Sequence, residues 1–295
     1  MKINQGIILT LVVAIVCILL VFQRNTSGQG HEHHHHAENI ETPEVIVDLE
    51  MHPPVLLSGT PSRILFRIKD AEGRALHNLT VTHDRLLHVI IVSKDFSVFA
   101  HIHPDDSGPI TDEMKKRAEF EVTYIFPKAG QYLIAVDSAV KGIPFSEHFS
   151  IDVTGEPSMG PQKKDLSKEK SFGDYQVSLI SRPAVVSAGK ETNLIYRIRK
   201  NGTAVSDLEP YLSAPMHLAV ISADLNTFVH AHGEIPGEAP AQHHAGGHMH
   251  GSVPGKFGPE IYAHIIFPTK GLYQVFSELK HQGRVIPLSF MVDVE

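Results

Sequence analysis

The stretch LHVIIVSKDFSVFAHIH, residues 87–103, recurs as MHLAVISADLNTFVHAH at residues 216–232. The two copies align without a gap, and every histidine keeps its spacing. Each copy holds two short runs of apolar and β-branched residues around a turn that contains an aspartate, Asp95 or Asp224. Short apolar runs joined by such a turn are typical of a β-hairpin, so the sequence predicts one hairpin per copy.

The repeat extends beyond the hairpin. Downstream, the motif Phe-Pro-x-x-Gly-x-Tyr occurs at residues 126–132 and again at residues 267–273. Self-similarity of this kind indicates a duplicated module. We therefore expect a first domain at 44–154, a linker rich in Lys, Ser, Gly and Pro at 155–173, and a second domain at 174–295.

Within each copy the pattern indicates an all-β fold. The first copy contains seven short segments rich in β-branched and aromatic residues, and it shows no long amphipathic helix. Seven short strands in about 110 residues are typical of an immunoglobulin-like β-sandwich, so we predict two tandem sandwiches, with an open barrel as the alternative. The tyrosine of the Phe-Pro-x-x-Gly-x-Tyr motif is well placed for a corner before a late strand. The expected strands are 45–50, 63–69, 87–92, 98–103, 119–126, 131–137 and 145–153.

The composition excludes several classes of function. The chain has 295 residues, with 26 Lys and Arg against 33 Asp and Glu, and its net charge of −7 offers no cationic surface to a nucleic acid. Its single cysteine excludes an internal disulfide and any Cys-x-x-Cys metal or redox site. The 21 histidines are an unusually large number, so any metal site is expected to use imidazole, carboxylate or thioether ligands.

The N-terminus predicts export. An apolar run over 7–22 lacks a convincing cleavage site, so residues 1–24 are expected to form an uncleaved transmembrane anchor, with a cleaved signal peptide as the alternative. Lipidation of Cys17 is disfavoured because Val16 precedes it. Each of these forms places the rest of the chain in the periplasm or the extracellular space, at the inner or cell membrane. Residues 25–43 are polar and aperiodic, which indicates a flexible tether.

The repeated histidines predict a metal site in each copy. Residues i and i+2 of a strand face the same way, so His101 and His103 project from one face. An even-numbered hairpin turn brings His88 to that face, whereas an odd turn or a bulge takes it to the other face. Three imidazoles in one place suit copper or zinc. The corresponding set in the second copy is His217, His230 and His232.

Other segments add candidate ligands. Met216 brings a thioether that favours Cu(I). The spacing from His-x-His to Phe-Pro grows from 23 to 35 residues in the second copy, and this insertion, at 236–256, has small residues between its histidines. Both the insertion and the tether are expected to bind metal with modest affinity and fast exchange, which suits capture, buffering or transfer of the ion. The candidate ligands of the two segments are His31, His33, His34, His35, His36, His243, His244, His248, Met249 and His250.

His52, whose counterpart in the second copy is Arg182, offers an additional soft site together with Met51. The remaining histidines have no counterpart in the other copy and are expected to be surface or packing residues. They are His77, His83, His148, His264 and His281. Asp105 and Asp106, which follow the first His-x-His motif, are interpreted as part of a solvated loop in preference to an oxygen ligand.

The Phe-x-His-x-His strand, the Phe-Pro-x-x-Gly-x-Tyr turn and the N-terminal export segment resemble exported bacterial immunoglobulin-like modules of the YtkA/FixH-like kind. More distantly, they resemble the periplasmic copper-resistance sandwiches of the CopC kind. The resemblance covers both repeats and implies a β-sandwich outside the cytoplasm that handles copper or another metal, with the two histidine sets as its ligands. The chain lacks the N-terminal histidine and the Met-rich loop of CopC-like proteins, so their Cu(I) and Cu(II) sites are not assumed here.

The sequence therefore favours a membrane-anchored, exported metal-binding protein. Copper is the preferred ion and zinc the second choice, and the expected partner is a membrane or periplasmic metal acceptor protein. The alternative is a non-catalytic envelope module with a structural or protein-interaction role. An enzyme is not expected, because the sequence has no His-Glu-x-x-His, no Gly-x-Ser-x-Gly and no carboxylate at a shared spacing that would act as a general base.

Overall fold

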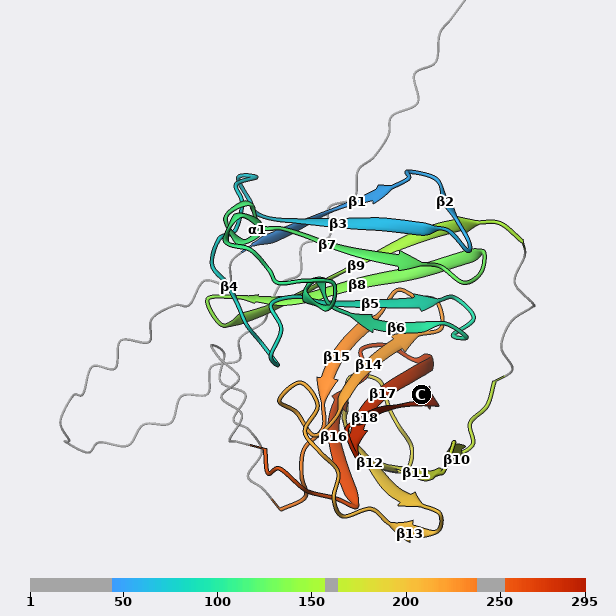
Figure 1. Cartoon of the computed structure of the whole chain (residues 1–295). Helices are drawn as coiled ribbons and strands as arrows, with labels where there is room; N and C mark the ends of the chain where they lie inside the picture. Colours follow the sequence, from blue (N-terminus) through green and yellow to red (C-terminus); the bar gives the residue numbers. More distant parts are fainter. Residues whose placement is uncertain (1–43, 157–163, 238–252) are drawn as a thin grey trace, which may run out of the picture. The chain divides into compact units, whose positions relative to one another are not determined.

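The computed structural model describes residues 44–156, 164–237 and 253–295. The regular structure of these residues is almost all β-strand (Figure 1), which confirms the all-β prediction. Their helical elements are one short α-helix, α1 (Asp112–Arg117), and one 3-10 turn, η1 (Pro104–Asp106). None of the helices in the described part of the chain has the length and apolar character needed to span a bilayer. The predicted anchor and tether, 1–43, lie outside the described residues.

The first repeat is a sandwich of two sheets. One sheet has the order β1-β3-β7, and the other has the order β2-β9-β8-β5-β6, with β4 beside β8. The main strands reproduce the A-B-E and G-F-C-C′ sheets of an immunoglobulin fold, so the structure is a sandwich and not an open barrel. The strands are β1 (Val45–His52), β2 (Leu56–Leu57), β3 (Pro61–Asp70), β4 (Leu79–Thr80), β5 (His88–Ser93), β6 (Phe99–Ile102), β7 (Glu119–Ile125), β8 (Gly130–Val140) and β9 (Ile143–Thr154).

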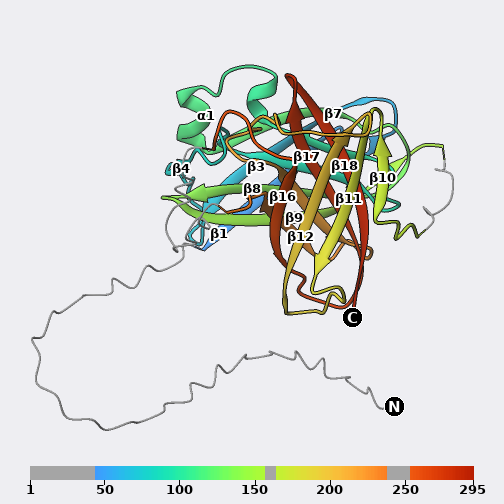
Figure 2. The same cartoon turned by 90° about the horizontal axis from the view of Figure 1, so that it is seen from below.

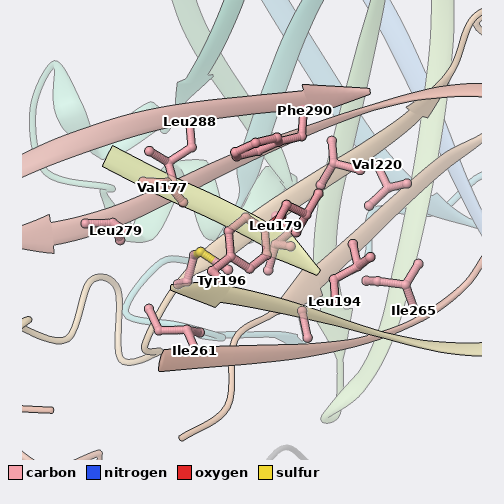
Figure 3. Packing of buried hydrophobic residues seen from close by; sticks show 14 of the residues in the cluster. Val177, Leu179, Leu194, Tyr196, Val220, Ile261, Ile265, Leu279, Leu288 and Phe290 are labelled. Carbon is pink, nitrogen blue, oxygen red and sulfur yellow. The ribbon is translucent and has the colours of Figure 1, made fainter. Parts of the chain in front are cut away.

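The second repeat has the same strand order. One sheet runs β10-β11-β12-β13 with β16 paired to β12, and the other runs β15-β14-β17-β18 (Figure 1). Figure 2 shows β10, β11, β12, β16, β17 and β18 of this repeat from below. Figure 3 shows its core, in which Tyr196, Leu179 and Phe290 pack between the sheets. The strands are β10 (Glu169–Phe172), β11 (Tyr175–Arg182), β12 (Glu191–Lys200), β13 (Thr203–Ala204), β14 (His217–Ser222), β15 (Phe228–His232), β16 (Glu260–Ile266), β17 (Gly271–His281) and β18 (Arg284–Val294).

The linker is shorter than predicted, because its last residues form strand β10. Residues 155–173 were expected to be linker, but β10 pairs with β11 inside that range. The reason is Phe172, whose ring packs edge to face against Phe290 at 5.7 Å between centroids and is partly buried on the second core. Residues 42–295 form one compact unit, so the division into two separate domains stays a prediction.

The tyrosine of the repeated turn forms a corner in both repeats. The hydroxyl of Tyr132 donates to the carbonyl of Lys128 at 2.9 Å, and that of Tyr273 donates to the carbonyl of Thr269 at 3.0 Å. Both tyrosines are fully buried. These hydrogen bonds satisfy the buried tyrosine hydroxyl of each repeat. They also hold the turn that leads into β8 and β17, as the motif predicts.

The strands that carry the first histidine of each set, β5 and β14, are buried on both faces. Val89 and Ile91 belong to the core of the first repeat, whereas Ile90 and Val92 belong to a third cluster that both repeats share. We call this third cluster the inter-repeat core. Its buried residues are Ile90, Val92, Phe96, Leu133, Ala135, Ala219, Ile221, Leu225, Phe276 and Met291. Burial on both faces explains why these strands read as continuous apolar runs and not as an alternating pattern.

Candidate metal centre

The hairpin between β5 and β6 sets the direction of the first three histidines. The backbone N–H of Ser93 donates to the carbonyl of Val98 at 3.1 Å, which leaves a turn of four residues. Asp95 holds the turn by accepting from the hydroxyl of Ser93 at 2.7 Å and from the backbone N–H of Ser97 at 3.2 Å. The even-numbered turn brings His88 to the face of the His-x-His pair, as the spacing predicts.

Three nitrogens of His88, His101 and His103 form a small triangle. The Nδ1 of His88 lies 3.1 Å from the Nε2 of His101 and 3.3 Å from the Nε2 of His103. The two Nε2 atoms of His101 and His103 lie 3.2 Å apart. All three side chains are at most 3% exposed, so the triangle is closed to bulk water.

The opposite nitrogen of each ring contacts an acceptor. The Nε2 of His88 donates to the carbonyl of Thr82 at 3.1 Å. The Nδ1 of His101 lies 2.7 Å from Oε2 of Glu278. For His103, Nδ1 lies 3.1 Å from Oδ2 of Asp106. Carbonyl and carboxylate oxygens only accept, so they hold each ring proton on the outer nitrogen and turn three lone pairs inward.

The triangle fits a metal ion. Three ligands about 2.0–2.1 Å from a tetrahedral ion lie roughly 3.3–3.4 Å from one another, close to the distances observed here. Burial lowers the pKa of His88 far below its usual value and lowers the pKa of His103 to about 4. Both rings are therefore neutral at physiological pH, which is the form that ligates a metal.

The second set is arranged differently from the prediction. His217 donates from Nε2 to the carbonyl of Leu212 at 3.2 Å, and its Nδ1 lies 3.3 Å from the Nε2 of His230. However, the group whose ligand atoms all lie within 4.8 Å of one another is His83, His217 and His232. His230 thus sits beside this group, and His83 of the first repeat joins it.

His83 was expected to be a surface or packing residue, and it does pack, but against two of the predicted ligands of the second repeat. The turn between Thr82 and Arg85 carries it over the second repeat, where its ring stacks on that of His232 at 3.7 Å between centroids. Comparison of the two copies could not find it, since the corresponding turn, between Tyr211 and Ala214, has Leu212 at this position.

The two histidine groups adjoin. The rings of His88 and His217 lie 5.9 Å apart between centroids, and those of His101 and His217 lie 5.8 Å apart. The Nδ1 of His230 lies 3.1 Å from Oδ2 of Asp137. His101 and His230 are matched positions of the two His-x-His motifs, and each contacts a carboxylate of the other repeat.

Two further expectations need correction. Met216 lies in the core of the second repeat and is fully buried there, because neighbouring residues of a strand point to opposite faces and His217 points to the histidine groups. Asp106 is more than part of a solvated loop, since it accepts from both the backbone and the ring of His103. Asp105 pairs with Arg85 at 2.6 Å. The candidate ligands at positions 31–36 and 243–250 lie outside the described residues.

A cavity of about 490 Å³ opens onto the second group. Its walls include His83, His230 and His232, together with the apolar side chains of Phe145 and Phe228. This cavity gives solvent and small ions a route to the histidines that line it.

A family model described as "Domain of unknown function (DUF8832)" matches residues 41–155 and again residues 170–295. The chain belongs to the DUF8832 family. The two DUF8832 matches coincide with the two repeats of the fold. Comparison with curated proteins found no match. The resemblance to YtkA/FixH-like and CopC-like proteins remains a prediction, because the DUF8832 match does not test it.

Solved structures similar to this DUF8832 chain include bacterial surface proteins. The adhesin FdeC of Escherichia coli is 11% identical, with 86% of this chain and 65% of that chain covered and a TM-score of 0.23. The adhesin InvE of Yersinia pseudotuberculosis is 10% identical, with 83% and 58% covered and a TM-score of 0.23. Domains 4 and 5 of the S-layer protein SbsC are 11% identical, with 85% and 98% covered and a TM-score of 0.22. The chain spans less than two thirds of FdeC and InvE, and these similarities are too weak to support a function.

Proposed function

We propose that this DUF8832 protein binds a transition-metal ion through His88, His101 and His103. One observation carries the proposal: three imidazole nitrogens lie 3.1–3.3 Å apart, while the opposite nitrogen of each ring contacts a carbonyl or carboxylate oxygen. Three lone pairs at this distance repel one another unless a cation lies between them. An all-imidazole set suits copper, our first choice, and also zinc.

The proposed role is capture, buffering or transfer of the ion outside the cytoplasm. The burial of all three imidazoles favours holding an ion over catalysis at this set. Export rests on the apolar segment at 1–24, and the receiving partner would be a membrane or periplasmic metal acceptor protein. Metal handling is also what the YtkA/FixH-like resemblance implies.

A second candidate is a non-catalytic envelope module in which the histidines are structural. The observation in its favour is that the histidines form hydrogen bonds across the two repeats, such as that between His101 and Glu278. In that case, the same side chains stabilise the packing of the repeats, and the protein acts through its β-sandwich surfaces. Replacing His101 would then lower stability without changing metal content.

Metal titration of the full chain separates the two candidates. The histidines of the tether and the insertion are first replaced by Ser, because they would bind metal by themselves. Cu(I), Cu(II) and Zn(II) are then titrated against this background, its His101→Ala and His103→Ala variants, and a control, His148→Ala, whose side chain is exposed on β9. We expect at least one tightly bound equivalent, and one equivalent should be lost in each of the first two variants and kept in the control. Absence of binding in the background, or equal binding in all variants, overturns the proposal.

A further inference from the structure

Building on the metal site proposed above, we propose that His83, His217 and His232 bind a second metal ion. The chain would then hold a two-metal centre built by both repeats. The ion belongs to the same class, a transition metal that prefers imidazole, such as copper or zinc. Neither repeat contains this second site alone, because His83 comes from the first repeat and the other two ligands from the second.

The geometry of the second group resembles that of the first. The ligand atoms of its three residues lie within 4.8 Å of one another. The carbonyl of Leu212 holds the proton of His217 on Nε2, which turns the lone pair of Nδ1 inward. The Nε2 of His230 lies 3.3 Å from that Nδ1, while Asp137 lies beside its Nδ1. His230 thus lies next to one ligand atom of the group without belonging to the three that lie within 4.8 Å of one another.

The surrounding charges suit two cations. Three carboxylates contact the histidine rings, namely Asp106 on His103, Glu278 on His101 and Asp137 on His230. Asp106 is 41% exposed and also pairs with Arg85, whereas Glu278 and Asp137 are largely buried and their two charges match two monovalent ions.

The second group is more open to the cavity than the first. His83 and His232 line the cavity of about 490 Å³, whereas His88 is the one ligand of the first group that does so. An ion that arrives from solvent therefore meets two ligands of the second group and one of the first. The contact between the rings of His88 and His217 joins this outer group to the inner one.

The alternative is that His83 only packs against His232. The two roles are separated by replacing His83 with leucine, the residue that occupies the same turn position, Leu212, in the second repeat. Leucine is therefore compatible with such a turn and supplies apolar packing without a ligand nitrogen. His83→Leu should fold, and it removes the ligand alone.

The test uses the full chain with the tether and insertion histidines replaced by Ser. Zn(II) and Cu(I) are titrated in competition with a chelator, and circular dichroism confirms the fold of each variant. We expect two equivalents in the background. His83→Leu should weaken one equivalent at least about tenfold and leave the other, and His101→Ala should remove the other. His148→Leu is the matched control and should keep both. With Cu(II), the paired ions should give the magnetic coupling of a close pair, which His83→Leu abolishes.

The outcomes distinguish this inference from the proposed function. One equivalent that is lost in His101→Ala and unchanged in His83→Leu overturns the second site and leaves the first. Two equivalents that are both unaffected by His83→Leu overturn the role of His83 and hence the inference. No equivalent in the background overturns both proposals.

Discussion

Glu278 of the second repeat lies with Oε2 2.7 Å from Nδ1 of His101 in the first repeat. The reverse contact, from Asp137 of the first repeat to His230 of the second, measures 3.1 Å. Asp137 pairs in register with His88, and Glu278 pairs in register with His217, so the two carboxylates hold the same place in their repeats. The second repeat thus orients His101 through a hydrogen bond, whereas the approach of Asp137 to His230 lacks hydrogen-bond geometry, and the geometry of the first site depends on both sandwiches.

We predict that Glu278→Gln weakens metal binding at the first site by about 10- to 100-fold, although no ligand is removed. The amide no longer supplies the negative charge that fixes the ring proton of His101 and raises its basicity. The affinity is measured by competition with a chelator. Glu147→Gln, on the exposed edge of β9, is the control. Equal affinity in both variants would show that the contact has no role in ligation.

The inter-repeat core should be required for the site. The ring of Phe276 stacks on that of Phe99 at 4.3 Å between centroids and is 5% exposed. Phe276→Ala should cost about 3–5 kcal/mol of unfolding free energy, measured by denaturant titration. It should also weaken metal binding, because Glu278 lies two residues further along β17. Val285→Ala, an exposed position on β18, should change neither quantity. Unchanged metal affinity in Phe276→Ala would contradict the dependence on both repeats.

The metal-free protein should lose stability in acid. Burial, followed by the nearby charge of His101, lowers the pKa of His103 from 6.5 to about 4. Between these values the unfolded chain binds a proton that the folded chain does not, so stability falls as the pH drops from 6.5 towards 4. For His103 alone the loss between pH 7 and pH 4.5 is about 2 kcal/mol. Denaturant titrations of chelator-treated protein at pH 7 and pH 4.5 measure it, and His103→Gln should show a smaller drop. The same drop in wild type and variant would contradict this assignment.

The tyrosine corners should contribute differently to stability. Tyr132→Phe removes one hydrogen bond, to the carbonyl of Lys128, and should cost about 1 kcal/mol. Tyr273→Phe should cost more, because its hydroxyl also lies 2.7 Å from the hydroxyl of Thr269 and 3.2 Å from its backbone nitrogen. Thermal or denaturant unfolding of the two variants compares them. A larger loss for Tyr132→Phe would contradict the ranking.

The sequence was sufficient for the contacts that depend on local geometry. The parity of the hairpin turn and the period of a strand bring His88, His101 and His103 to one face, and the Phe-Pro-x-x-Gly-x-Tyr spacing predicts the corner. The same period shows why the expectation for Met216 was wrong. A residue next to His217 on a strand must face the core when the histidine faces outward from the sandwich.

Contacts between the repeats could not be predicted. Comparison of the two copies finds only histidines that occur at the same position in both, and the position of His83 is a leucine in the second copy. Asp137 and Glu278 do match, but their partners lie across the inter-repeat core, and no local pattern specifies how two sandwiches pack. Strand β10 was missed because its ordering depends on a contact with Phe290, which lies far along the chain.

The crossed carboxylates have the contact pattern of an isologous interface, in which residue i of one copy meets residue j of the other and the reverse also holds. In a homodimer of identical chains, any change at one turn appears at both, and the two sites remain identical. A single chain that carries both copies is free of this constraint. The difference between His83 and Leu212 is an asymmetry that a homodimer of identical chains cannot have, and in the proposed two-metal centre it would give the two ions unequal coordination and unequal access to solvent.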